Sequence, residues 1–192
     1  MDTYERIKFY NSGFTMVELM ITITIAGVVA AFGVPSFTQA IQNSRLTTSA
    51  NELVASLGFA RSEAVKRNQA ITVRKSLSEW EDGWIVFVDD NEDGVKDLGE
   101  TMLRVYDGMP NNYTLRSTGI NRVTFQSTGI SGNGSFVLCE NGDGNNIPEA
   151  FTSRVVIINT VGRVRMGVDT DDNGIPEKDD GEIVSCVNSP FV

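Results

Sequence analysis

The chain has 192 residues, of which 41% are hydrophobic and 21% charged, a composition typical of a folded globular protein and not of a disordered one. It contains no histidine, which removes the commonest general base and zinc ligand, and its two cysteines are too few for a zinc-ribbon or iron–sulfur site. The formal net charge of -9 argues against a general nucleic-acid-binding protein. Without a histidine or an evidently buried lysine, no nucleophile–base pair can be assembled, so we expect a protein that is not an enzyme.

The first apolar segment runs from Phe14 to Val34 and contains a single charged residue, Glu18. A helix over this segment would be about 30 Å long, which is the thickness of the hydrocarbon core of a bilayer. In an ordinary secretory signal, small residues and the cleavage site follow the apolar stretch, whereas here Gly13 precedes it. The segment therefore predicts one transmembrane helix over residues 14–34, preceded by a short polar leader over residues 1–13.

A carboxylate inside a membrane segment costs about 2.5–3.5 kcal/mol on insertion scales, so Glu18 needs an explanation. In one interpretation, Glu18 lies near the helix end and reaches the membrane interface. In the other, it pairs with a cation at the same depth. Cleavage between Gly13 and Phe14 would supply that cation, because the new α-amine of Phe14 on a neighbouring subunit would be positively charged.

A second helical segment follows Pro35, which we expect to kink or locally break the helix because proline removes a hydrogen bond and clashes with the preceding turn. Beyond it, apolar residues recur at three- and four-residue steps from Phe37 to Val65, and polar residues occupy the opposite face. Asn68 is a suitable C-terminal stop. The pattern predicts an amphipathic helix over residues 35–68 that packs on its own globular domain.

The remainder of the chain, residues 69–192, has the pattern of a β-rich domain. Short segments rich in β-branched and aromatic residues are bounded by Gly, Asn or Asp, and they predict strands at 70–74, 84–88, 101–106, 113–116, 122–126, 135–140, 154–159, 162–166 and 182–186. No further helical stripe separates them. We therefore expect an α+β fold in which a long N-terminal helix, transmembrane in its first half and amphipathic in its second, packs on a C-terminal antiparallel β-sheet domain.

The sequence GFTMVELMITITIAGVVAAFGVPSF resembles the N-terminus of type IV pilins and type II secretion pseudopilins. Gly13, Phe14, Thr15, Glu18 and Pro35 match that pattern in order and spacing. The resemblance implies cleavage after Gly13 by a prepilin peptidase, N-methylation of Phe14, and packing of the apolar helices into a filament core, with Glu18 acting in assembly. The leader departs from the usual basic pilin leader because its charges cancel.

The segments LGFARSEAV and GWIVF, followed by DDNEDG, resemble minor pilins and pseudopilins of the FimT, FimU and GspH type. This resemblance implies a single-pass protein of the bacterial inner membrane with a periplasmic C-terminal domain. The protein would then enter a pilus, its tip complex or a pseudopilus. A pilus would carry it to the cell surface. Its partners would be other pilins, the prepilin peptidase and inner-membrane lipid. The alternative is a GspH-type pseudopilin of a type II secretion system that acts in protein export without binding DNA.

A Gly-Arg-x-Arg sequence follows the predicted strand at 154–159 and contains Arg163 and Arg165, which share a face if the segment is extended. Arg154 lies on the neighbouring predicted strand. Guanidinium groups suit phosphate oxygens, and the FimT-type resemblance associates this motif with weak, sequence-independent DNA binding during natural transformation. In the alternative interpretation, both arginines pair with nearby carboxylates.

The two cysteines, Cys139 and Cys186, both fall in the β-rich domain. If that domain lies outside the cytoplasm, the compartment is oxidising and favours a disulfide between them. The bridge would attach the acidic C-terminal tail to the sheet. The alternative is a pair of unpaired buried thiols.

No cofactor is required by these interpretations, but two acidic segments are candidate calcium loops. Residues 89–100 fit the pattern D-x-[DN]-x-[DN]-G-x5-E, which would supply oxygen ligands from Asp89, Asn91, Asp93, Val95 (main chain), Asp97 and Glu100. A looser copy contains Asp169, Asp171, Asn173, Gly174, Glu177 and Asp180. Because Asp, Asn and Gly are also common in hairpin turns, ordinary loops remain the alternative.

Overall fold

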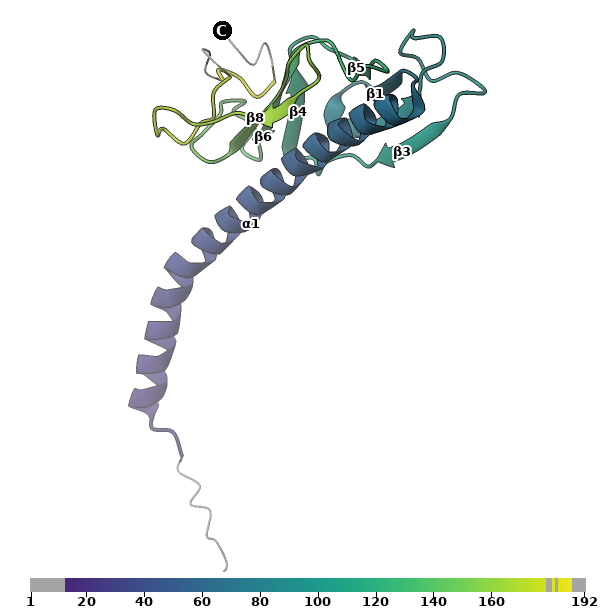
Figure 1. Ribbon diagram of the computed structural model, residues 1–192. Coiled ribbons are helices and arrows are strands. Elements are labelled where there is room, and N and C mark those ends of the chain that lie inside the picture. The colour runs from purple at the N-terminus through teal and green to yellow at the C-terminus, as the bar shows by residue number, and fades with distance from the viewer. Residues whose placement is uncertain (1–12, 179–180, 182, 188–192) are drawn as a thin grey trace, which may run out of the picture. The chain divides into compact units, whose positions relative to one another are not determined.

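The computed structural model describes residues 13–178, 181 and 183–187, and the chain divides into two compact units (Figure 1). The first unit ends at Ala40 and the second begins at Ile41. One helix, α1 (Met16–Arg67), contributes to both. Its helical backbone continues through position 35, so no break occurs at Pro35, and the kink expected there stays a prediction.

The C-terminal end of α1 has the features that the sequence predicts. Asn68 adopts the left-handed conformation with φ of 54°, and the N–H of Gln69 donates to the carbonyl of Ala64 at 3.3 Å. This is the Schellman type of helix ending. Lys66 and Arg67 lie in the last turn, where positive charge interacts favourably with the helix dipole.

The rest of the second unit forms two antiparallel four-stranded sheets. The first has the order β3-β2-β1-β5, with β1 (Ile71–Lys75), β2 (Trp84–Val88), β3 (Met102–Tyr106) and β5 (Arg122–Phe125). The second has the order β4-β6-β7-β8, with β4 (Tyr113–Ser117), β6 (Gly134–Glu140), β7 (Ser153–Ile158) and β8 (Val164–Met166). A short 3-10 helix, η1 (Trp80–Asp82), precedes β2.

Eight of the nine strands expected from the sequence are present, and none of their ends is shifted by more than two residues. The ninth strand was expected at 182–186, and Glu182 lies outside the described residues. For residues 183–186 the prediction is wrong, because they form no strand. These residues instead lie against the second sheet. Covering a sheet face buries apolar side chains without requiring a ladder of main-chain hydrogen bonds.

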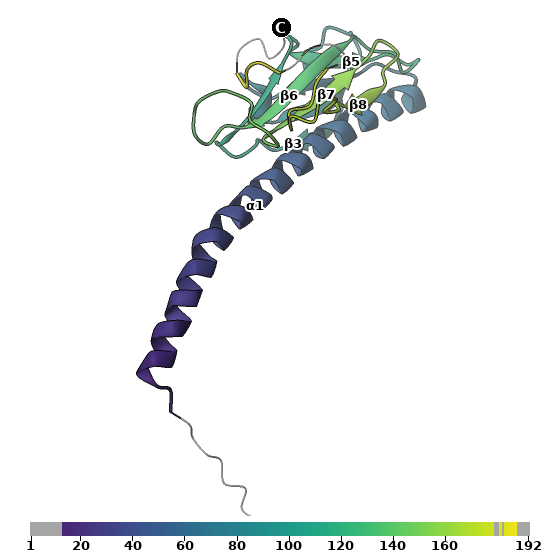
Figure 2. The same cartoon turned by 90° about the vertical axis from the view of Figure 1, so that its left-hand side faces the viewer.

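The main core lies between the two sheets and the amphipathic part of α1, as Figures 1 and 2 show. One stripe of the helix is fully buried and contacts the inner faces of both sheets: Leu46, Ala50, Leu53, Leu57, Ala60 and Ala64. The buried Trp84 side chain donates its indole N–H to the hydroxyl of Ser56 on the helix at 2.9 Å. The predicted α+β fold, a long helix packed on antiparallel sheets, is therefore confirmed.

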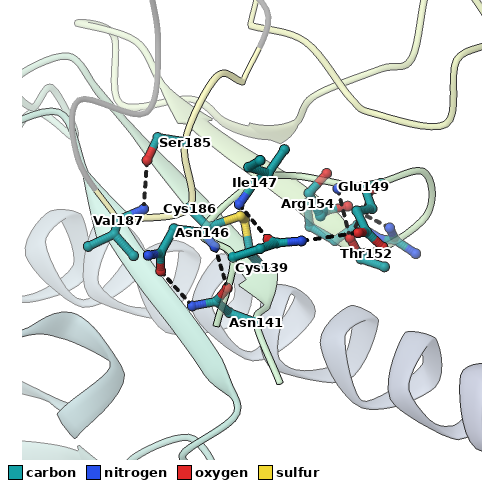
Figure 3. The surroundings of a disulfide bond; sticks show 12 residues. Cys139, Asn141, Asn146, Ile147, Glu149, Thr152, Arg154, Ser185, Cys186 and Val187 are labelled. Atoms are coloured by element: carbon teal, nitrogen blue, oxygen red, sulfur yellow. Dashed lines mark hydrogen bonds between the residues drawn. A yellow bond between two sulfur atoms is a disulfide. The ribbon is translucent and has the colours of Figure 1, made fainter. Parts of the chain in front are cut away.

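A second, smaller core covers the outer face of the second sheet. The side chains of Val137, Cys139, Val155 and Ile157 on β6 and β7 pack there against Ile183 and Cys186 of the tail. A disulfide joins Cys139 to Cys186, with Cα atoms 5.7 Å apart (Figure 3). The disulfide thus attaches the tail to the sheet that it covers.

We predict that removing this disulfide with Cys139→Ala and Cys186→Ala lowers the free energy of unfolding by about 4 kcal/mol, because the cross-link closes a long loop in the unfolded chain. Denaturant unfolding followed by tryptophan fluorescence measures the difference. The reduced wild-type protein should match the variant. A loss below about 1 kcal/mol would contradict the stabilising role assigned to the bridge.

Candidate functional site

The first unit exposes a continuous apolar surface. Large side chains from Phe14, 76% exposed, to Phe37, 74% exposed, point outward around the helix. α1 contains a stretch long and apolar enough to cross a membrane, and none of that stretch is buried. A helix that is apolar all round needs lipid or other apolar helices around it.

Glu18 lies at the start of this apolar helix and forms a capping box with Thr15. The N–H of Thr15 donates to Glu18 Oε2 and the N–H of Glu18 donates to Thr15 Oγ1, both at 3.1 Å. The hydroxyl of Thr15 also donates to Glu18 Oε2 at 2.9 Å. Because Thr15 follows Phe14 directly, the carboxylate is held one residue from the expected new N-terminus.

The Gly-Arg-x-Arg motif forms the tight turn between β7 and β8. Gly162 has φ of 73°, and its N–H donates to the carbonyl of Asn159 at 2.8 Å. A Cβ at this position would lie 2.0 Å from the carbonyl oxygen of Gly129. The glycine of the motif is therefore required by the turn and by the close approach of another loop.

Arg163 and Arg165 follow this turn and belong to the outer side of the second sheet. Arg163 is exposed, while Arg165 is half-buried and lies opposite Ile157, which belongs to the outer apolar cluster. Directly opposed residues on antiparallel strands share a face. The side chain of Arg165 therefore lies on the face that the C-terminal tail covers.

Arg154 does not join these two arginines, although it lies on the neighbouring strand β7 as the sequence predicts. Its guanidinium donates to Asn43 Oδ1 and, at 3.1 Å, to Thr47 Oγ1, both on α1. Burial lowers the pKa of Arg154. Arg154 thus connects the sheet to the helix on the face opposite to Arg165.

The first acidic loop, residues 89–100, joins β2 to β3. Its first residue, Asp89, is fully buried, and Asp89 Oδ2 accepts hydrogen bonds from Thr72 Oγ1 at 2.6 Å and from the N–H of Gly94 at 3.0 Å. Asp89 Oδ1 is also buried and has no hydrogen-bond partner among the described residues. The other acidic side chains of the loop are exposed or half-buried.

The second acidic loop, residues 169–177, brings three carboxylates together. One oxygen each from Asp169, Asp171 and Glu177 lies within 4.8 Å of the others. The N–H of Gly174 donates to Asp169 Oδ2 at 2.7 Å, as the N–H of Gly94 does to Asp89 in the first loop. Asp180, the last residue of this loop in the sequence prediction, lies outside the described residues.

A third loop of this kind, residues 141–149, was not identified from the sequence. The N–H of Asn146 donates to Asn141 Oδ1 at 2.9 Å (Figure 3). The N–H of Asn145 donates to Asp143 Oδ1 at 3.2 Å. Its sequence, NGDGNNIPE, aligns with DTDDNGIPE of the second loop. This internal repeat is the sequence feature from which the third loop could have been identified.

The three loops share one backbone geometry. In each of them, the fourth and sixth residues have positive φ: Glu92 (60°) and Gly94 (71°), Gly144 (70°) and Asn146 (61°), Asp172 (59°) and Gly174 (87°). In each, the main-chain N–H of the sixth residue also donates to the side chain of the first. This arrangement turns the oxygens of alternate side chains toward the inside of the loop.

Comparisons with known proteins agree with this architecture. The model of the family described as type II transport protein GspH matches residues 49–162, and that of the prokaryotic N-terminal methylation motif matches residues 8–34. Among curated protein sequences, none matches the chain significantly.

Solved structures of two relatives are similar to the chain. The type IV minor pilin FimU of Pseudomonas aeruginosa is 26% identical in two crystal forms, with TM-scores of 0.53 (74% of this chain and 96% of that chain covered) and 0.50 (67% and 98%). The minor pseudopilin EpsH of the type 2 secretion system of Vibrio cholerae is 13% identical, with a TM-score of 0.48 and coverage of 64% and 95%. From the family match, the methylation motif and the exposed apolar helix, the chain belongs to the GspH family, the minor pilins and pseudopilins of type IV pili and type II secretion.

Proposed function

We propose that this protein is a minor type IV pilin that a prepilin peptidase cleaves after Gly13 and that is N-methylated at Phe14. Residues 14–34 then hold it in the lipid of the inner membrane, and residues 69–192 lie in the periplasm. In the amphipathic segment, residues 35–68, the apolar stripe from Leu46 to Ala64 packs on that domain. The protein leaves the membrane by joining a pilus or its tip complex. There the exposed apolar helix surface is covered by the helices of other pilins.

The exposed apolar helix with one carboxylate at its start is the observation that carries this proposal. Transfer from lipid to a bundle of apolar helices changes the hydrophobic burial little, so a specific polar contact is needed to direct assembly. Glu18 and the α-amine of a neighbouring Phe14 are oppositely charged and lie at the same end of their helices. Their pairing offsets the cost of a buried carboxylate.

We predict that Glu18→Ala leaves the processed protein in the membrane and reduces its incorporation into filaments at least tenfold. Immunoblots of sheared filaments and membrane fractions from the same cells measure the distribution. Thr15→Ala is the matched control, because it removes the capping hydroxyl, at a cost of about 1 kcal/mol, but keeps the carboxylate. Equal loss of assembly in both variants would attribute the effect to the helix cap and contradict the proposed ion pair.

A second function, DNA binding during natural transformation, is supported by the exposed position of Arg163 beside the turn between β7 and β8, with the half-buried Arg165 on the same face. Arg154 is not part of this surface, because its guanidinium is bonded to α1. The alternative is a GspH-type pseudopilin that acts in protein export by type II secretion and does not bind DNA. The nearby second acidic loop would repel phosphate and favours that alternative.

For DNA binding, we predict that Arg163→Gln with Arg165→Gln weakens binding of a short duplex. It should also reduce the slope of log affinity against log salt concentration by about 2, because each lost phosphate contact removes about 0.9. Fluorescence anisotropy with the full-length protein in a neutral detergent measures both. Lys66→Gln with Arg104→Gln removes the same charge from two exposed positions elsewhere. Equal effects of the two double variants would contradict a site at the motif.

A further inference from the structure

We propose that the first acidic loop, residues 89–100, binds one calcium ion. The ligands are the side-chain oxygens of Asp89, Asn91, Asp93, Asp97 and Glu100 and the main-chain carbonyl of Val95. This binding site is independent of filament assembly and of DNA binding.

The burial of Asp89, with one carboxylate oxygen left without a hydrogen bond, is the observation that points to a ligand. Its side chain is fully buried, and its two carboxylate oxygens have different surroundings. Oδ2 accepts two hydrogen bonds, from Thr72 and from Gly94, whereas Oδ1 has no partner in the described part of the chain. A buried charged oxygen without a partner is destabilising, and a cation bound at Oδ1 would compensate it.

The hydrogen bond from Gly94 shows that this carboxylate is directed into the loop. Gly94 is the sixth residue of the loop and Asp89 the first, so the bond closes the turn and leaves Oδ1 for another contact. Substitution of Gly94 is restricted, because its φ is 71° and an added Cβ would lie 1.9 Å from Arg122 Cδ. The turn therefore fixes the position of the buried carboxylate.

Two carboxylates of the loop share one side-chain donor. The side-chain amide nitrogen of Asn91 lies 3.0 Å from Asp93 Oδ2 and 3.0 Å from Asp97 Oδ2, so a single donor group bridges two carboxylates. A cation would take over this bridging position, with the amide of Asn91 turned so that Oδ1 faces the ion. Glu100 closes the loop by accepting the N–H groups of Asp90 at 3.0 Å and Asp97 at 2.8 Å.

Arg74 and Arg122 lie beside Gly94, but in the described part of the chain neither forms an ion pair with the carboxylates of the loop. Among the described residues, no ion pair joins them to a lysine or arginine. The nearby Arg74 donates instead to the main-chain carbonyl of Gly94, at 2.6 Å. The loop has six acidic residues and one lysine, so its charges repel one another.

Calcium suits this ligand set better than magnesium does. Calcium takes six to eight oxygen ligands in flexible geometry, whereas magnesium requires a strict octahedron and retains several of its waters. Five side chains and one carbonyl provide enough oxygens for calcium. The proposal is restricted to the first acidic loop, because Asp89 is fully buried, whereas Asp169, whose Oδ1 also has no partner among the described residues, is half-buried.

The test uses the full-length protein in a neutral detergent, stripped of divalent ions with a chelator. Equilibrium dialysis with radioactive calcium measures the number of ions bound per chain, and thermal unfolding measures the stabilisation. We expect saturable binding with a dissociation constant below about 1 mM and an unfolding midpoint that rises with calcium concentration. Magnesium at the same concentrations should raise the midpoint much less.

Asp93→Asn with Glu100→Gln should lower the number of bound calcium ions by one. Asp93 is exposed and Glu100 half-buried, so the variant should fold, and its unfolding midpoint without calcium should be no lower than that of the wild type, because two mutually repelling charges are removed. Asp89→Asn should likewise lose the calcium-dependent stabilisation. Glu52→Gln with Asp107→Asn, at two exposed positions outside the loops, is the charge-matched control and should bind calcium as the wild type does.

Three results would overturn the proposal. The first is no stoichiometric calcium binding at 1 mM or below. The second is an unchanged number of bound ions in Asp93→Asn with Glu100→Gln. The third is equal stabilisation by magnesium, which would indicate general screening of an acidic surface.

Discussion

The whole molecule depends on a helix that has two different apolar surfaces. Up to Ala40, the apolar side chains of α1 are exposed around the helix, and they require lipid or other helices. From Leu46 to Ala64, a single apolar stripe is buried against the two sheets of the same chain. In the proposed function, the first surface holds the protein in a membrane and then in a filament. The second surface fixes the folded domain to the helix.

The second sheet shows how this domain is stabilised while its loops remain available for binding. β6 and β7 are buried on both faces, by the helix on one side and by the C-terminal tail on the other. The disulfide from Cys139 to Cys186 holds that tail in place. Candidate binding groups accordingly lie in the connections, in the turn that carries Arg163 and in the three loops with alternating Asp and Asn residues.

The sequence predicted the helix, its end at Asn68 and eight strands because hydrophobic periodicity and turn residues are local properties. It predicted a pilin or pseudopilin from a few residues around Gly13 and Glu18, and the GspH type from the segments LGFARSEAV and GWIVF with the loop DDNEDG. The orientation of Arg154 could not be predicted, since Val155 to Ile158 are all buried and the usual alternation of faces is lost. The burial of Asp89 could not be predicted either, because it depends on Thr72 of another strand. The third loop was missed because it has asparagine at its first and sixth positions, where the calcium pattern has Asp and Gly.

The central claim is that assembly begins with a trimmed helix whose new amine meets the carboxylate of Glu18. Mass spectrometry of the mature protein, isolated from the membranes of its own cells, tests that claim most directly. We expect the mature polypeptide to begin at Phe14 and to bear one methyl group on its amine. A mature protein that begins at any other residue would contradict it.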